Sequence, residues 1–412
     1  MHLELLTIGT ELLLGFTVDT NSAFMGQRLG EIGVTVSRRT SIGDDPVAIR
    51  AALIDALARS RFVITTGGLG PTRDDMTKKV VAELFNAPLE FHDDLAQALI
   101  ARFAKFGRVP APSNRCQSEV PKGALVLPNK RGTAPGLWLS GPLGEVIMLP
   151  GVPVEMRGLI TDEVIPRLRE RSASVITKSL VLRTTSIPES SLADRLSAVE
   201  DGLAPLTLAY LPGVEGVDLR LTAWSVAGDD ADRLLEDAGR RVREVVGDFC
   251  YGTGEQDLAA LLLDELRERH LWLAVAESCT GGMIGERITA VPGSSEVFSG
   301  GVIAYADAVK QSALDVPSES LREHGAVSEA VVRAMAEGVA RKTGADVSIA
   351  ITGVAGPGGG SSEKPVGTVW VGFSVLGEVT AQRIGLPGNR YEVRARASQF
   401  ALHGLLRRLR QV

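Results

Sequence analysis

The stretch that decides the fold of the last third of the chain begins with the apolar run Leu271–Ala276 and continues into the polar turn Glu277-Ser278-Cys279-Thr280-Gly281-Gly282. A short, continuous apolar run predicts a buried strand. A strand that ends in small polar residues and two glycines is typical of an open α/β sheet that builds a site at its carboxyl edge. The stretch extends to Lys310 and adds further hydroxyls, a phenol and an amine. We therefore expect an active site here.

Composition limits the classes of protein that this chain can belong to. Its 412 residues exceed one ordinary core, so two or three domains are expected. A formal net charge of −6 disfavours direct binding of nucleic acid. No apolar run approaches the roughly 18 residues of a membrane span. Three scattered cysteines and five unclustered histidines favour a cytoplasmic protein with neither a disulfide framework nor a zinc site.

The first part, residues 1–170, alternates predicted strands with predicted helices. Asp19-Thr20-Asn21-Ser22 supplies cap candidates for a helix that runs to about Leu29, and Ile42-Gly43-Asp44-Asp45-Pro46 is expected to cap a helix that runs to about Ala58. This alternation predicts a parallel sheet with right-handed crossovers. A proline-rich interruption makes residues 107–123 an expected exposed loop. The strands are expected at Leu3–Ile8, Val34–Ser37, Phe62–Thr66 and Val146–Leu149.

A glycine-rich loop, Gly67–Thr77, follows the third of these strands. Glycines such as Gly67 and Gly68 free backbone N–H groups to face an anion, and the next helix adds its dipole. Asp75 lies in the same loop and Asp44 follows a neighbouring strand. Carboxylates beside a phosphate cradle are typical of a bound divalent cation, although these residues could also be simple turn and cap residues.

Gly67–Thr77 resembles the signature of the MoaB/MogA-type molybdopterin-binding fold, a three-layer α/β domain. Further motifs narrow the resemblance to the CinA family: Gly9-Thr10-Glu11-Leu12-Leu13 with Asn21, Gly132-Thr133-Ala134-Pro135-Gly136, and Pro150-Gly151-Val152-Pro153-Val154-Glu155-Met156. The resemblance implies a metal-dependent pyrophosphatase acting on ADP-ribose-like substrates. It places a divalent ion (Mg, Mn or Co) on Asp44 and Asp75, and substrate on Gly67, Gly68 and Thr77. Hydrolysis and adenylyl transfer both remain open.

The middle part, residues 171–252, has the order of a small α+β module that resembles a KH-like unit. Strands are expected at Val175–Thr184, Leu206–Leu211 and Val217–Trp224, with an amphipathic helix at Asp229–Val246. It has no basic stripe and no GxxG loop in the right setting, so a structural or dimerisation role is favoured over RNA binding. Gly252-Thr253-Gly254 is expected to be a linker.

The last part, residues 253–412, again alternates strands and helices, and its nucleophile must be chosen among several groups. A strand-end cysteine such as Cys279 is usually a small buried hydrophobe. A serine nucleophile needs a base, and His324 lies in an expected loop, so a Ser–His–Asp triad fits poorly. A desolvated lysine can accept a proton from serine. Lys310 could therefore be such a base or simply a solvated helix residue.

Several motifs in this part resemble the PncC-type C-terminal domain of CinA proteins, a nicotinamide mononucleotide deamidase. The resemblance implies a Ser–Lys pair on Ser295 and Lys310, with Ser294 as the neighbouring alternative, and a tyrosine on Tyr305. It places substrate on Thr352, Gly353 and Arg390, and requires no cofactor. The motifs are Glu277–Gly282, Gly293-Ser294-Ser295, Gly300–Tyr305, Gly325–Glu329 and Thr352–Pro357.

The sequence thus favours a bifunctional hydrolase of pyridine-nucleotide salvage. Its partners would be nicotinamide mononucleotide and ADP-ribose, and a homodimer is expected. One alternative is a nucleotide-sensing scaffold linked to competence or DNA damage, with a recombination or competence protein as partner. Another is a first domain that handles molybdopterin.

Overall fold

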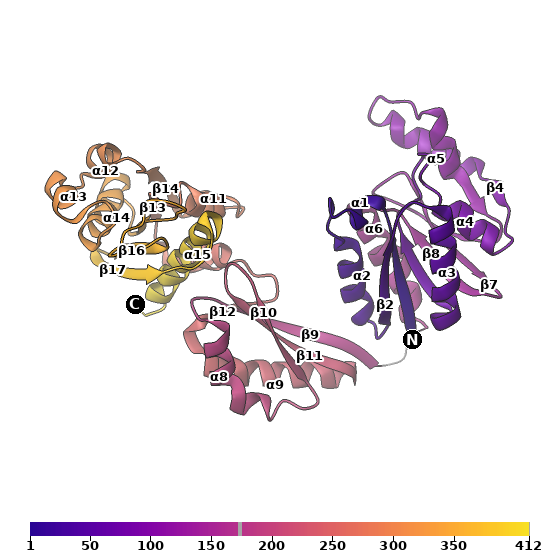
Figure 1. Ribbon diagram of the computed structural model, residues 1–412, viewed down its shortest axis with the longest axis horizontal. Coiled ribbons are helices and arrows are strands. Elements are labelled where there is room, and N and C mark those ends of the chain that lie inside the picture. The colour runs from indigo at the N-terminus through magenta and orange to yellow at the C-terminus, as the bar shows by residue number, and fades with distance from the viewer. Residues whose placement is uncertain (172–174, 412) are drawn as a thin grey trace. The chain divides into compact units, whose positions relative to one another are not determined.

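The structure is a computed structural model that describes residues 1–171 and 175–411. The chain divides into two compact units, Met1–Lys178 with Ala223–Arg233, and Ser179–Thr222 with Leu234–Val412. The described residues form an N-terminal, a middle and a C-terminal sheet, together with a two-stranded sheet (Figure 1). No helix among the described residues combines the length and the apolar character needed to cross a bilayer.

The N-terminal sheet has six strands in the order β2-β1-β3-β8-β7-β6. The first four of these are parallel: β2 (Thr35–Ile42), β1 (His2–Ile8), β3 (Phe62–Thr66) and β8 (Gly144–Leu149). The other two, β7 (Gly136–Gly141) and β6 (Leu125–Leu127), are antiparallel. The parallel sheet expected from the alternating pattern is therefore confirmed.

Alternate side chains of β1 enter separate cores on the two faces of this sheet, as the period of a strand requires. Leu3 and Leu5 face the core that contains α2 (Thr20–Gly30), α6 (Pro153–Leu159) and α7 (Ile165–Arg169). Leu6 and Ile8 face the core that contains α3 (Pro46–Ser60) and α4 (Thr77–Leu84). The domain is thus the expected three-layer α/β structure. Asp19 and Asp45 accept hydrogen bonds from Ser22 N and Ala48 N as the helix caps of α2 and α3.

The expectation of an exposed loop at residues 107–123 is wrong for its second half. After α5 (Asp93–Ala104), the chain forms a 3₁₀ helix over Pro112–Ser118 and then β5 (Glu119–Pro121), which pairs with β4 (Leu89–Phe91). Val120 is 1% exposed and packs in the core beside α3 and α4. The segment is therefore fixed by its pairing with β4 and by buried residues that include Val120.

The middle sheet has the order β10-β11-β9-β12, formed by β10 (Thr207–Pro212), β11 (Val217–Ala227), β9 (Val175–Thr184) and β12 (Cys250–Thr253). It carries α8 (Glu189–Glu200) and α9 (Gly228–Val246). The expected linker at Gly252-Thr253-Gly254 is corrected, because Gly252 and Thr253 pair with Arg183 and Leu182 of β9.

The C-terminal sheet has the order β14-β13-β15-β16-β17. Its first three strands are parallel: β14 (Phe298–Ile303), β13 (Leu273–Glu277) and β15 (Val347–Gly353). β16 (Thr368–Val375) and β17 (Glu378–Gly385) run antiparallel. The sequence analysis did not anticipate β17.

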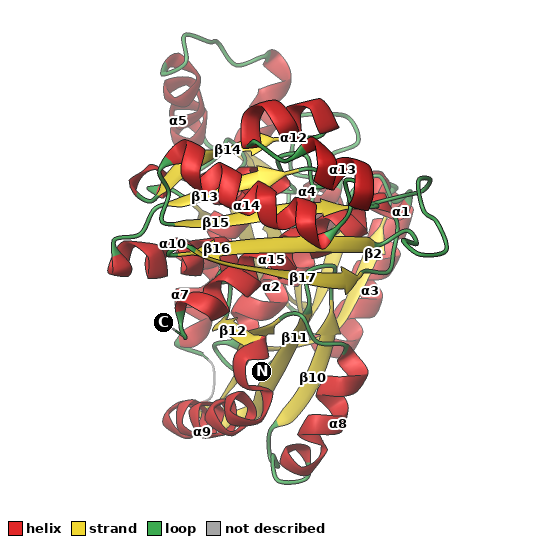
Figure 2. Cartoon of the chain, turned by 90° about the vertical axis from the view of Figure 1, so that its left-hand side faces the viewer, coloured by secondary structure: helices red, strands yellow, loops and turns green. Residues whose placement is uncertain are grey.

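Helices cover both faces of this sheet. One core contains α10 (Leu258–Arg269), α11 (Met283–Thr289) and the long α15 (Arg390–Leu409). The other contains α12 (Asp307–Leu314), α13 (Ser318–His324) and α14 (Glu329–Thr343), and Figure 2 shows these three helices in front of the strands. The carboxyl ends of β14, β13 and β15 meet at one edge of the sheet, which is where a site is expected.

Candidate active sites at two sheet edges

Ser278 lies at the centre of the carboxyl edge of the C-terminal sheet. It directly follows β13, and its backbone N–H donates to Ile351 O of β15 at 3.0 Å. On the other side, Ala304 N donates to Glu277 O at 2.8 Å. The backbone at Ser278 is therefore fixed between the ends of β14 and β15, and the residue is 8% exposed.

The Glu277 carboxylate shapes the turn in which Ser278 lies. It is buried and accepts N–H groups from Gly282, Ile284 and Gly285, so it satisfies the otherwise unpaired donors at the start of α11. Gly281 and Gly282 have φ values of 59° and 98°, a conformation that glycine adopts without strain. Glu277 is thus a structural group rather than an acid or base.

Lys310 is almost completely buried beside this turn, with 1% of its surface exposed. Its Nζ donates to Tyr305 O at 3.1 Å and lies 3.4 Å from Asp307 Oδ1. Tyr305 follows Ala304, the residue that bonds to β13 next to Ser278. The structure therefore brings Lys310 and Ser278 to the same edge from α12 and β13.

Tyr305 is joined to two other segments at the edge through Arg390. Arg390 is the first residue of α15, and its Nη2 donates to Tyr305 Oη at 3.0 Å while its Nη1 donates to Gly356 O at 2.7 Å. Asn389 caps the helix by accepting two backbone N–H groups. The arginine expected to bind phosphate is thus at the same edge as the phenol.

Thr352 and Gly353 end β15 at this edge. Thr352 is 1% exposed and donates its hydroxyl to Ala326 O at 2.9 Å. A Cβ at Gly353 would meet Thr368 O at 2.8 Å. Both residues fix the beginning of the loop that continues through Gly356. A direct contact of Thr352 with substrate would have to use the lone pairs of its hydroxyl oxygen.

Ser295 is not brought to Lys310, and this corrects the expected pair. Ser294 and Ser295 lie in a 3₁₀ turn, Ser294–Glu296, before the amino end of β14. Arg267, at the end of α10, donates to Glu296 and holds this turn beside the start of β13. Because β13 and β14 are parallel, the six residues of β14 separate this turn from the carboxyl edge by roughly 17 Å at about 3.3 Å per residue.

Cys279 and Thr280 complete the turn after Ser278. Burial raises the pKa of the Cys279 thiol to about 12, so this cysteine is a packing residue, as expected from the sequence. Thr280 is fully buried, its hydroxyl has no hydrogen-bond partner among the described residues, and its carbonyl accepts two bonds from Arg394. The sequence analysis did not single out Ser278 or Arg394. The position of Ser278 directly after a predicted strand was the available signal.

The loop Gly67–Thr77 lies at the corresponding edge of the N-terminal sheet. Gly67 and Gly68 have φ values of 108° and 69°, and a Cβ at Gly68 would collide with Thr77 Oγ1. Thr77 is fully buried and donates its hydroxyl to Gly67 O at 2.9 Å. Gly67 is buried and its N–H donates to Leu149 O at 3.0 Å, whereas Gly68 is half-buried. Thr77 therefore holds the loop in shape.

Both candidate metal ligands already accept hydrogen bonds, Asp44 from the segment that follows β1 and Asp75 from its own loop. Asp44 Oδ2 accepts the N–H and the hydroxyl of Thr10, each at 2.8 Å. Asp75 accepts Gly70 N at 2.7 Å and both the N–H and the hydroxyl of Thr72. No group of three or more acidic, histidine or cysteine side chains that could hold a metal is found in the part of the chain that the structure describes. This donor set fits a cation that arrives with a diphosphate, since Mg²⁺ commonly uses one or two carboxylates together with phosphate oxygens and water.

Two further polar groups lie at the same edge. Asn21 donates to Thr66 Oγ1 at 3.2 Å and to Gly151 O at 2.7 Å, while its buried Oδ1 has no partner among the described residues. Glu155, in the first turn of α6, accepts a hydrogen bond from Asn129, and burial raises its pKa. Both belong to motifs that the sequence analysis noted.

Comparisons with known proteins were made for the whole chain. Three family models match successive segments: "Probable molybdopterin binding domain" over residues 4–170, "Damage-inducible protein CinA KH domain" over 179–252, and "CinA C-terminal domain" over 255–409. A CinA-like protein of Gemmatimonas aurantiaca is 52% identical over 411 residues, covering 99% of this chain and 96% of its own length. The chain belongs to the CinA family.

Other relatives show the same likeness. A CinA-like protein of Parasynechococcus marenigrum is 44% identical over 410 residues and covers 98% of each chain. A crystal structure of a CinA superfamily protein from Klebsiella pneumoniae is 36% identical, with a TM-score of 0.37, and covers 38% of this chain and all of its own. The three family models and the two CinA-like relatives confirm the resemblance to the CinA family and to its N-terminal, KH and C-terminal domains.

Proposed function

We propose that the C-terminal domain hydrolyses the carboxamide of nicotinamide mononucleotide to nicotinate mononucleotide and ammonia. The observation that carries this proposal is the convergence of Ser278, Tyr305, Lys310 and Arg390 at one sheet edge. A hydroxyl and a buried amine at the same sheet edge are suited to nucleophilic acyl transfer. A guanidinium near the same point is suited to a phosphate ester, because its fork can bond two oxygens.

In the proposed reaction, Ser278 Oγ attacks the carboxamide carbon and Lys310 Nζ accepts the hydroxyl proton. The C–N bond of the resulting tetrahedral intermediate breaks, and ammonia leaves with a proton relayed through Lys310 or Tyr305. Water then hydrolyses the ester and regenerates Ser278. Arg390 holds the ribose phosphate, and the loop that follows Thr352 and Gly353 contributes backbone N–H groups. This assignment replaces Ser295, which lies at the opposite end of β14.

We propose that the N-terminal domain cleaves the diphosphate of ADP-ribose-like nucleotides. Support comes from the glycine turn at Gly67 and Gly68 at the end of β3, the carboxylates of Asp44 and Asp75, and Glu155 with its raised pKa as a candidate proton donor. A divalent cation would be held by Asp44, Asp75 and the substrate, and would supply polarisation of the phosphoryl oxygens. The family description of this segment keeps molybdopterin as the second candidate ligand.

The C-terminal activity is tested by ammonia release from nicotinamide mononucleotide and from nicotinamide riboside, which lacks the phosphate. We expect release from the mononucleotide at a much lower KM, and we expect Arg390→Lys to raise that KM by a larger factor than the KM for the riboside. Lys310→Met should abolish release from both substrates. No release from either substrate by the unmodified chain would contradict the hydrolase and favour a nucleotide-sensing scaffold.

The N-terminal activity is tested separately by incubating the full chain with ADP-ribose and Mg²⁺, Mn²⁺ or Co²⁺. We expect AMP and ribose 5-phosphate, and loss of both products in Asp75→Asn. An inactive chain that instead binds molybdopterin would contradict the pyrophosphatase. Ammonia release should be the same in Asp75→Asn and in the unmodified chain, which shows that the variant is folded.

A further inference from the structure

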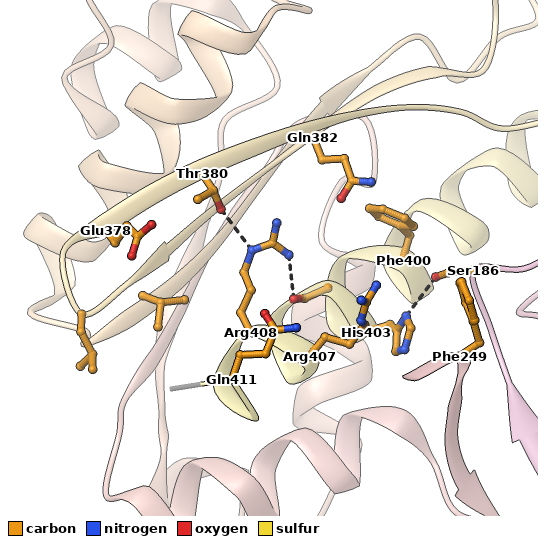
Figure 3. Close-up of a pocket in the computed structure, with 13 residues that line it drawn as sticks. Ser186, Phe249, Glu378, Thr380, Gln382, Phe400, His403, Arg407, Arg408 and Gln411 are labelled. Atoms are coloured by element: carbon orange, nitrogen blue, oxygen red, sulfur yellow. Dashed lines mark hydrogen bonds between the residues drawn. The ribbon is translucent and has the colours of Figure 1, made fainter. Parts of the chain in front are cut away.

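One cavity in the C-terminal half of the chain is lined by none of the residues proposed for catalysis. It has a volume of about 800 Å³ and lies where the end of α15 and the β16–β17 hairpin meet Ser186 and Phe249 of the middle domain (Figure 3). Its size is within the range of small-molecule sites. Arg407 and Arg408, which line it, are 17 and 18 residues beyond Arg390 on the same helix, or roughly 25 Å at about 1.5 Å per residue.

Arg408 brings a positive charge to this cavity without a carboxylate partner. Its Nε donates to Thr380 Oγ1 at 3.1 Å, its Nη1 donates to Gly404 O at 2.9 Å, and its guanidinium lies 3.9 Å from the centre of the Phe373 ring. No acidic side chain of the described residues lies within ion-pair distance of it. Burial, and then the neighbouring Arg407, lower the pKa of Arg408. A desolvated cation of this kind favours an anionic ligand.

Arg407 adds a second guanidinium that is incompletely satisfied. Its Nη2 lies 3.1 Å from Asp248 Oδ2, but its Nε is buried and has no acceptor among the described residues. Buried donors are nearly always paired, so this unpaired N–H shows that the described residues do not fully satisfy the Arg407 guanidinium. Two adjacent guanidinium groups are well suited to a phosphate.

The remaining walls are suited to a flat ring bearing polar groups. Figure 3 shows Gln382 extending from β17 into the cavity and Phe400 of α15 beside it, with Phe249 at the end formed by the middle domain. Gln382 is exposed and carries both an amide donor and an acceptor. Glu378 is the one carboxylate among the hairpin residues that line the cavity. Its negative charge repels an anionic ligand and so lowers the affinity of the cavity for that ligand.

We propose that this cavity binds a nucleoside phosphate, with its phosphate on Arg407 and Arg408 and its base against Phe400 and Gln382. The ligand would contact the middle and C-terminal domains together. The site is separate from the catalytic edge, and its existence does not depend on the reaction proposed there.

The probe is 8-azidoadenosine 5′-monophosphate, cross-linked to the full chain by light and located by peptide mapping. We expect labelled peptides from residues 376–383 and 400–411. Calorimetry with adenosine monophosphate on the same chain should show binding that weakens about tenfold in Gln382→Glu, because the exposed side chain then repels the phosphate. Glu378→Gln should tighten binding a few-fold. Arg410→Gln is the matched control for Arg408→Gln. It likewise removes one positive charge near the end of α15, but Arg410 does not line the cavity.

Two results would overturn the proposal. The first is labelling confined to the two sheet edges, with no label on β17 or the end of α15. The second is binding of inorganic phosphate as tightly as the nucleotide, or binding that Gln382→Glu leaves unchanged. Because Gln382 is exposed, its replacement does not endanger folding. Arg408→Gln is a second variant that should weaken binding about tenfold relative to Arg410→Gln.

Discussion

Acidification is expected to destabilise the contact between α15 and the middle domain through one buried histidine. His403 is 2% exposed. Its Nε2 lies 2.9 Å from Asp248 O and its Nδ1 lies 3.1 Å from Ser186 Oγ. These partners assign the neutral ring a proton on Nε2, with Nδ1 accepting from the serine hydroxyl. A second proton would place a charge in a buried position beside Arg407.

The magnitude follows from the change in pKa on folding. Burial lowers the pKa of His403 from 6.5 to about 4, and the nearby Arg407 and Arg410 act in the same direction. Because the folded value is below the unfolded one, the neutral ring contributes its full stability above about pH 6.5. That contribution is lost as the pH falls toward 4. The shift is worth about 3 kcal/mol, of which roughly 2.5 kcal/mol is lost between pH 7.5 and pH 4.5.

The assay is urea unfolding of the chain and of His403→Gln at both pH values. The variant is expected to be less stable at pH 7.5 and to lose about 2 kcal/mol less on acidification than the unmodified chain, since carboxylates that titrate in both proteins cancel in the difference. Equal losses in the two proteins would refute this reasoning. So would an NMR titration that places the pKa of the His403 ring near 6.5 in the folded chain.

Three further predictions concern the two edges. Glu277→Gln should lower the free energy of unfolding of the C-terminal domain by roughly 2–4 kcal/mol, because one amide oxygen cannot accept three N–H groups; an unchanged urea midpoint would argue against the cap. Iodoacetamide at pH 8 should modify Cys116 well before Cys279, whose pKa burial raises to about 12; rapid labelling of Cys279 would contradict its packing role. Chelation by EDTA should stop cleavage of ADP-ribose and leave ammonia release unchanged; loss of both activities would contradict a cation confined to the N-terminal site.

Much of the fold could be predicted because local signals agreed with the tertiary structure. Asp45 caps α3 as expected, since an Asp-Pro pair before an apolar repeat leaves little choice of start. The apolar run at β3 is completely buried between two helical layers. β17 was not foreseen, because its exposed outer residues alternate too weakly with its half-buried ones to mark a strand. Gly252 was expected to lie in a linker because glycine composition does not reveal pairing with a distant strand such as β9.

The candidate sites were predicted less completely than the fold. Loops that follow parallel strands gather at one edge, so the turn after β13 and the loop after β3 were both found. The prediction that Ser295 pairs with Lys310 is wrong because the fifteen-residue interval between them contains the whole of β14. This strand carries the chain from one edge of the sheet to the other. The direction of β14 was itself predictable, and it would have favoured Ser278.

The central claim is that Ser278, and not Ser295, attacks the carboxamide. The direct test is ammonia release from nicotinamide mononucleotide by the matched variants Ser278→Ala and Ser295→Ala. The structure predicts a loss of at least about 10³-fold for Ser278→Ala and activity within about twofold of the unmodified chain for Ser295→Ala. Retention of activity by Ser278→Ala together with its loss in Ser295→Ala would contradict the account.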